Sequence, residues 1–233
     1  MPVTIGSKKK KIFFYFILFF FLSTVNFNNY KKENEKKFFS IDTIEIKGNK
    51  IIEKKNILES LTQLYGKNIF KLNIFEIKSQ LFNFNLIKNI SIKKYYPNKI
   101  EINIDEAEFI AIIVKNNTKY FLADNQKLVI YRDDLGIKKL PQLYGINAEK
   151  FFLNFKDILE SNKFDLSLIN NYYYFQINRW DLYLKNNIVV KLPTENVEQT
   201  ILLVKKIINK KEFLNSKIID LRIKEKIIVK DNE

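Results

Sequence analysis

The chain has 233 residues, a formal net charge of +14, and neither cysteine nor histidine. The lack of cysteine excludes a disulfide framework and thiol chemistry, and the lack of histidine removes the usual general base and the commonest metal ligand. Hydrophobic residues at 46% and charged residues at 28% predict a folded chain. Lysine is spread over all segments, which indicates a compositional bias and no nucleic-acid site. No phosphate loop or metal-ligand cluster occurs, so we predict no cofactor and no small-molecule substrate.

The N-terminal stretch predicts a membrane segment. Lysines at residues 8–11 precede a run without charge from Ile12 to Tyr30, and a membrane-spanning helix needs about 20 residues. We therefore predict a cytoplasmic tail at 1–11 and a transmembrane anchor at 12–30, because a basic flank normally stays inside. A cleaved signal peptide is the alternative, although Ser23 to Phe27 makes a poor cleavage site.

After a charged linker at 31–38, residues 39–106 predict a small β-α-α-β-β module. Apolar residues alternate in the strand at its start, then take helical spacing, and alternate again before and after a turn at Tyr96-Pro97. The second helix should begin at Asn73, which can cap it, with Glu76 completing a capping-box pattern.

Residues 107–233 predict a mostly antiparallel β-domain with flanking helices. A loop is expected at 140–145, fixed by Pro141 and Gly145, and a hairpin turn at Asn186-Asn187. The segment 217–230 should form one or two terminal strands. The fold class is thus α+β: an N-terminal transmembrane helix, the β-α-α-β-β module, and this β-domain.

Motifs in both modules resemble the bacterial cell-division family FtsQ, also called DivIB. The first module is similar to the POTRA domain of that family, and the second carries segments like those of its β-domain. The matching segments are Ile44 to Asn49, Asn68 to Leu72, Ile87 to Ile104, Tyr120 to Asp124, Leu140-Pro141 with Gly145, Arg179 to Leu182, Lys191 to Pro193, and Ile219 to Arg222. The chain departs from the family where the two modules join and directly after Arg222.

The resemblance implies a non-enzymatic scaffold of the division machinery. It implies a single-pass inner-membrane protein at the division septum, with the N-terminus cytoplasmic and the bulk of the chain periplasmic. The implied partners are FtsB-type and FtsL-type proteins and other divisome membrane proteins.

In the family the last strand of the β-domain pairs with the FtsB-type partner, and by position that strand would begin around Arg222 and Ile223. Exposed strand edges offer unpaired backbone groups to a partner. The expected partner-binding residues are Arg222, Ile223, Lys224, Glu225, Lys226, Ile227 and Val229. Plainer interpretations are a surface charge for Arg222, core packing for the apolar residues, and a charged turn for 224–226.

Two rival functions follow from other features. POTRA domains also occur in secretion and outer-membrane assembly systems, whose proteins continue into a β-barrel of many alternating segments. Such segments are not evident in this sequence. The adjacent carboxylates Asp105-Glu106 and Asp133-Asp134 suggest glycosidase chemistry, but neighbouring side chains diverge and no opposing carboxylate is placed. Trp180 is expected in the core rather than in a binding site.

Overall fold

The computed structural model describes residues 6–23, 38–137, 139–213 and 215–231. The chain divides into two units, residues 1–38 and 39–233. In the first unit, α1 spans Gly6–Ser23, and the remainder of the predicted anchor, residues 24–30, lies outside the described residues, as do residues 31–37 of the predicted linker. Among the described residues, we find no helix with both the length and the apolar character needed to cross a membrane.

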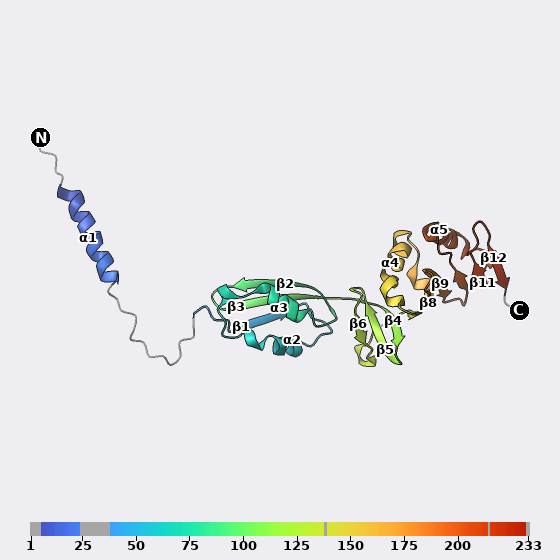
Figure 1. Ribbon diagram of the computed structural model, residues 1–233, viewed down its shortest axis with the longest axis horizontal. Coiled ribbons are helices and arrows are strands. Elements are labelled where there is room, and N and C mark those ends of the chain that lie inside the picture. Colours follow the sequence, from blue (N-terminus) through green and yellow to red (C-terminus); the bar gives the residue numbers. More distant parts are fainter. Residues whose placement is uncertain (1–5, 24–37, 138, 214, 232–233) are drawn as a thin grey trace, which may run out of the picture. The chain divides into compact units, whose positions relative to one another are not determined.

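The second unit begins with the small module, whose order is the predicted β-α-α-β-β (Figure 1). Its elements are β1 (Thr43–Lys47), α2 (Lys54–Ser60), α3 (Ile74–Leu81), β2 (Ile87–Tyr95) and β3 (Lys99–Glu106), with 3-10 turns η2 (Thr62–Leu64) and η3 (Ile69–Lys71). The strands form a three-stranded sheet in the order β1-β3-β2, in which β1 and β3 are parallel. Ile57, Leu61, Ile77 and Leu81 from the helical side join the sheet residues in one buried cluster.

The start of α3 shows how the sequence sets a boundary. The side chain of Asn73 accepts a hydrogen bond from the N–H of Phe75 at 3.0 Å, as an N-cap should. Glu76 accepts from the Asn73 side-chain amide at 2.9 Å. The predicted cap is confirmed, but Glu76 steadies the capping side chain instead of closing the box through a backbone N–H.

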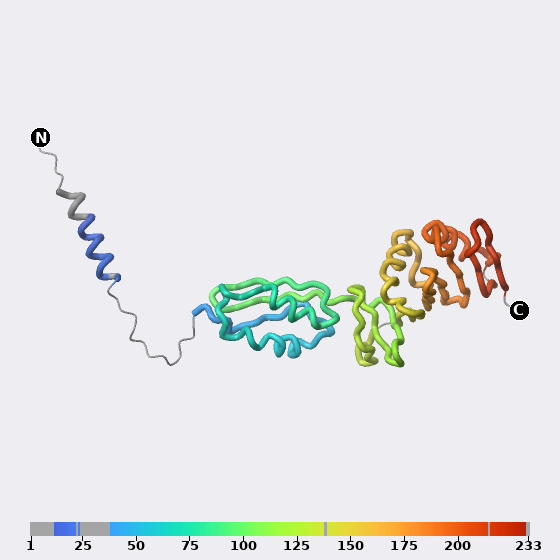
Figure 2. Tube along the Cα trace, in the orientation of Figure 1, coloured from blue at the N-terminus to red at the C-terminus, as the bar shows by residue number. Residues whose placement is uncertain are grey.

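The chain passes from β3 through Ala107 and Glu108 directly into a nine-stranded sheet (Figure 2). Its strands are β4 (Phe109–Lys115), β5 (Thr118–Ala123), β6 (Leu128–Ile130), β7 (Gln142–Tyr144), β8 (Ile169–Phe175), β9 (Arg179–Leu184), β10 (Val189–Lys191), β11 (Ser216–Asp220) and β12 (Ile228–Asp231). The order is β12-β11-β10-β9-β8-β7-β4-β5-β6. The β4–β7, β7–β8 and β10–β11 pairs are parallel and the other neighbours are antiparallel, so the sheet is mixed with an antiparallel majority.

Two helices make the crossovers for two of the three parallel pairs of this sheet, β7–β8 and β10–β11. α4 (Ala148–Ser161) connects β7 to β8, and α5 (Val197–Ile207) connects β10 to β11. Their apolar faces cover the sheet, where the ring of Phe155 stacks on Trp180 with centroids 4.7 Å apart. Trp180 is only 5% exposed, which confirms its predicted place in the core.

The prediction of a loop at 140–145 is wrong in its centre. Gln142–Tyr144 forms β7, which is flanked by β4 and β8 and receives backbone partners from both sides. The glycine was correctly singled out: Gly145 has φ +116°, and a Cβ there would lie 2.2 Å from the carbonyl oxygen of Tyr174.

Candidate functional site

The C-terminal hairpin forms one edge of the nine-stranded sheet. β12 pairs antiparallel with β11, and no described strand pairs with its other side. Four apolar side chains are exposed there: Ile223 (52%), Ile227 (42%), Ile228 (47%) and Val229 (39%). This edge therefore combines an unpaired backbone with apolar surface, the two properties that added-strand recognition uses.

The predicted start of the terminal strand at Arg222 and Ile223 is wrong. Residues 221–227 form the connection between the two strands, and the edge strand begins at Ile228. Glu225 takes a left-handed conformation with φ +62°, and the N–H of Lys226 donates to the Ile223 carbonyl at 3.1 Å. The charged residues at 224–226 therefore form a turn, which was the plainer of the two interpretations.

Arg222 is already engaged within its own chain. Its Nε donates to Oδ1 of Asp220 at 2.9 Å, and its Nη2 lies 2.6 Å from Oδ2. This guanidinium holds the pKa of Asp220 below its ordinary value, chiefly through the side-chain hydrogen bond. A carboxylate of a partner would therefore have to share the Arg222 guanidinium with Asp220. The ion pair between Arg222 and Asp220 also fixes the start of the 221–227 loop.

The direction of the backbone groups on β12 follows from its neighbours. The N–H of Leu221, just after β11, donates to the carbonyl of Lys191 on β10 at 2.9 Å. Because successive residues of a strand point to opposite sides, Asp220 directs its N–H and C=O toward β12, where it lies opposite Ile228. The next residue on β12, Val229, consequently directs its N–H and C=O to the open side of the sheet.

A groove of about 510 Å³ adjoins this edge between the start of α5 and the 221–227 loop. It brings together six of the seven predicted partner-binding residues, Arg222, Ile223, Lys224, Glu225, Lys226 and Ile227, and faces them with Glu195, Gln199 and Leu203. Val229 does not line the groove; it lies on β12. The predicted residues thus form two adjacent surfaces, a groove and an open strand.

A row of alternating charges crosses the strands that lead to this edge. Asp181 lies opposite Lys191, and Lys191 lies opposite Asp220. Asp181 is 4% exposed, with Nε of Arg179 3.3 Å from its Oδ1. Burial raises the pKa of Asp181, opposed by the nearby charges of Arg179, Lys191 and Arg222. The sequence analysis missed this row, for which the only signal was the Arg-Trp-Asp alternation.

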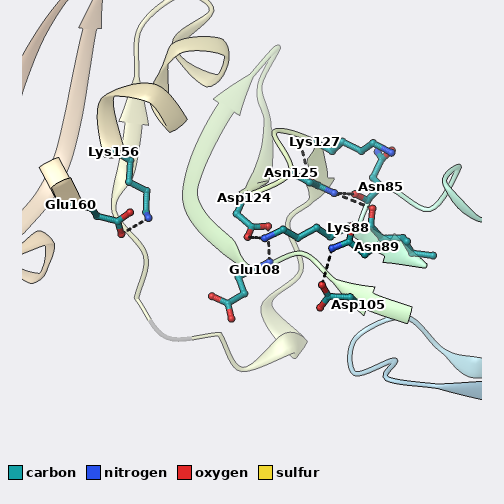
Figure 3. Close-up of polar contacts among 11 residues, drawn as sticks. Asn85, Lys88, Asn89, Asp105, Glu108, Asp124, Asn125, Lys127, Lys156 and Glu160 are labelled. Atoms are coloured by element: carbon teal, nitrogen blue, oxygen red, sulfur yellow. Dashed lines mark hydrogen bonds and ion pairs between the residues drawn. The ribbon is translucent and has the colours of Figure 1, made fainter. Parts of the chain in front are cut away.

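A second polar cluster joins the two modules (Figure 3). Oδ2 of Asp124 lies 2.6 Å from Nζ of Lys88, and its Oδ1 accepts from the N–H of Glu108 at 3.1 Å. Asn125 donates to the carbonyl of Asn85 at 2.9 Å, and Asn85 in turn donates to the carbonyl of Leu128 at 3.0 Å. The turn after β5 is thereby held against the segment before β2.

The adjacent carboxylates have structural contacts. Glu106 accepts backbone hydrogen bonds from Lys50, Ile51 and Ile52 at 3.0, 2.8 and 2.9 Å. Asp105 accepts from the Asn89 amide at 3.1 Å. Within the described residues, no group of three or more acidic side chains is placed to hold a metal ion.

These features define a protein with a POTRA-like module followed by a large mixed sheet that has an open C-terminal edge. The model of the FtsQ-type POTRA domain matches residues 39–107, and that of the C-terminal part of cell-division protein FtsQ/DivIB matches residues 111–222. The chain belongs to the FtsQ/DivIB family of cell-division proteins, as the sequence motifs predicted. The second match ends at Arg222, within the 221–227 loop and before β12.

Named relatives agree with this assignment. The chain is 30% identical to the cell division protein FtsQ of Rickettsia felis over 196 residues, which cover 82% of this chain and 72% of the relative. It is 33% identical to the cell division protein DivIB of Clostridium acetobutylicum over 113 residues, 48% of this chain and 45% of the relative. The solved extracytoplasmic domain of DivIB from Geobacillus stearothermophilus aligns over 46% of this chain and 99% of its own at 15% identity, with a TM-score of 0.30, too low to support a likeness.

Proposed function

We propose that the chain is a non-enzymatic scaffold of the bacterial division machinery that binds an FtsB-type partner, joined to an FtsL-type protein, by strand addition to β12. The proposal includes an inner-membrane anchor at 12–30 and a cytoplasmic tail at 1–11. The modules at 39–106 and 107–233 would lie in the periplasm at the division septum. Other divisome membrane proteins would assemble on the same scaffold. Membership of the FtsQ/DivIB family supports this general role.

The open side of β12 is the observation that carries the proposal. Val229 directs its N–H and C=O away from the sheet, and a partner strand would satisfy both. Ile228 is 47% exposed and Val229 39% exposed. A partner strand that covers them would remove their apolar surface from water, which is favourable. The backbone would supply affinity, and the side chains would select the partner's register.

The groove beside β12 supports an extension of the same interface. A partner strand that pairs with β12 would have one end near the 221–227 loop, which lines the groove with Ile223 and Ile227. The basic side chains Lys224 and Lys226 are exposed on that loop. They favour a partner segment with acidic residues flanking an apolar strand.

Proline at Val229 tests strand addition. Val229→Pro removes the N–H that points to the open side and spares the hydrogen bonds between β11 and β12, since proline is tolerated at a sheet edge. We expect binding of the full chain to the partner's periplasmic segment to weaken about tenfold or more, through the lost hydrogen bond and the intruding ring.

Val229→Ala is the matched control because it shortens the same side chain and keeps the N–H. Its affinity should stay within about threefold of the parent. Fluorescence of Trp180, which is buried in the core, verifies that each variant is folded. Equal affinity for Val229→Pro and the parent chain would rule out strand addition at this edge.

Septal localisation is tested separately in dividing cells. A fluorescent fusion of the full chain should form midcell rings, and a Val229→Pro fusion should still be membrane-bound but should recruit less of the FtsB-type partner. A uniform envelope signal for the parent chain would contradict the division role.

A further inference from the structure

An exposed aromatic cluster lies on the first module, away from the β12 edge in the sequence. The ring of Phe70 stacks on Tyr96 with centroids 4.9 Å apart and meets Phe39 edge-on at 4.9 Å. Phe70 is 58% exposed and Tyr96 57% exposed. Phe75, at the start of α3, is 78% exposed. We call Phe39, Phe70 and Tyr96 the aromatic patch, and Phe75 follows Phe70 by five residues in the chain.

The local structure holds this patch outward. Asn68 caps the 3-10 turn η3 by accepting from the N–H of Phe70 at 2.9 Å. In the same turn Ile69 is fully buried and its N–H donates to the carbonyl of Phe39 at 2.9 Å. Because Ile69 anchors the turn in the core, Phe70 projects to the surface. Clustered exposed aromatic side chains are unusual on a soluble surface and indicate an interaction site.

Lysines border the aromatic patch without carboxylate partners. Lys67 and Lys71 flank Phe70 in the chain. Both are exposed, and neither forms an ion pair with a described residue. By contrast, Lys47, Lys88 and Lys99 of the same module each pair with a carboxylate. The free lysines leave positive charge beside apolar surface.

We propose that the aromatic patch, with Lys67 and Lys71, docks the first module on the surface of an anionic lipid bilayer. Aromatic rings concentrate at the membrane interface and lysines attract anionic headgroups. The patch begins at Phe39, directly after the lysine-rich linker and the predicted anchor. This inference rests on the proposed anchoring, which would keep the module beside a membrane.

The absence of cysteine from the sequence allows a direct test. Phe75→Cys in the full chain is labelled with a polarity-sensitive dye and reconstituted into vesicles of phosphatidylglycerol and phosphatidylethanolamine. We expect a blue shift of the emission and quenching by lipids that carry a spin label near the headgroup. Ile177→Cys, at a 62% exposed position in the turn after β8, is the matched control. The dye at this position should keep the emission of an aqueous environment when vesicles are present.

The charge and aromatic contributions are tested with the dye kept at position 75. Lys67→Gln with Lys71→Gln, or vesicles of phosphatidylcholine alone, should remove most of the shift, and so should Phe70→Ser. Trp180 fluorescence verifies folding.

Resistance to alkaline carbonate extraction tests the anchor independently. An extracted chain would refute the anchor, whereas a retained chain with no emission shift from the dye at position 75 would refute lipid docking. A shift that appears only after FtsB-type and FtsL-type partners are added would identify a protein interface and would also overturn the lipid proposal.

Discussion

The two edge strands of the nine-stranded sheet differ in what lies beside them. At β6 the carbonyl of Leu128 accepts a hydrogen bond from Asn85, and Val129 packs against the cluster of Leu86, Ala107 and Ala123. At β12 the backbone of Val229 faces outward with no described strand beyond it. The first edge is thus contacted by the preceding module of the same chain, with a groove of about 600 Å³ beside it, and the second edge is open.

This difference indicates how the chain controls where its sheet can grow. An exposed edge is a general liability because any extended chain can pair with it. Here the module boundary reduces that liability at β6, because the Asn85 amide already takes the outward carbonyl of Leu128. An added strand is then directed to β12, where the apolar residues and the 221–227 loop can select it.

The largest effect on the free energy of unfolding is expected from truncating the buried apolar side chain that packs beside β6. Leu86 is 4% exposed, so Leu86→Ala should cost about 2–4 kcal/mol of unfolding free energy. Urea denaturation followed by circular dichroism measures this cost. Leu202→Ala, at a 44% exposed position on α5, is the control and should cost far less. Partner affinity at β12 should not change; a loss as large as that of Val229→Pro would show that the two edges are coupled.

A smaller effect is expected from the polar contact at the same boundary. Asp124→Ala removes the ion pair with Lys88 and the acceptor for the Glu108 N–H, and should destabilise the chain by about 1–3 kcal/mol. Asp124→Asn keeps an acceptor and should lose less. The same denaturation series measures both variants. If both were as stable as the parent, the polar cluster would not contribute to closing the β6 edge.

The smallest effect concerns pH and the row of charges beside β12. The pKa of Asp220 is lowered in the folded chain, so its stabilisation is present above its ordinary pKa and is lost as pH falls through the lowered value. The pKa of Asp181 is raised by burial, so protonation favours folding and its contribution improves as pH falls through the raised value.

Substitutions at these two positions should therefore act in opposite directions. Asp220→Asn should make the loss of stability in acid shallower, whereas Asp181→Asn should make it steeper, each by about 1 kcal/mol or less. Denaturation midpoints measured between about pH 3 and pH 6 distinguish the two cases. Parallel slopes for both variants would contradict the assignment of the charges.

The sequence predicted those parts of the fold that depend on local patterns. Alternation and helical spacing identified the β-α-α-β-β module, and the hairpin turn at Asn186-Asn187 is confirmed by Asn187 at φ +66°. The preference of asparagine for positive φ makes such a turn visible in sequence. Trp180 was also expected in the core, where it is 5% exposed.

The parts that were missed depend on distant neighbours. β7 is three residues long and becomes a strand only because β4 and β8 lie on either side of it. The 221–227 loop contains a positive φ at Glu225, a residue type that gives no turn signal, and the predicted strand start at Arg222 and Ile223 was carried over by position from the family. The module contact at Asp124 joins it to Lys88 through the tertiary fold, and no local pattern predicts that pairing.

Amide hydrogen exchange of the full chain, alone and with the periplasmic segment of the FtsB-type partner, tests the central claim most directly. If the partner adds a strand to β12, exchange at the Val229 N–H should slow strongly in the complex. The N–H of Ile130 on β6, which also lies on an edge strand, should exchange at an unchanged rate. An unchanged rate at Val229 in the saturated complex, or protection at Ile130 instead, would contradict the account.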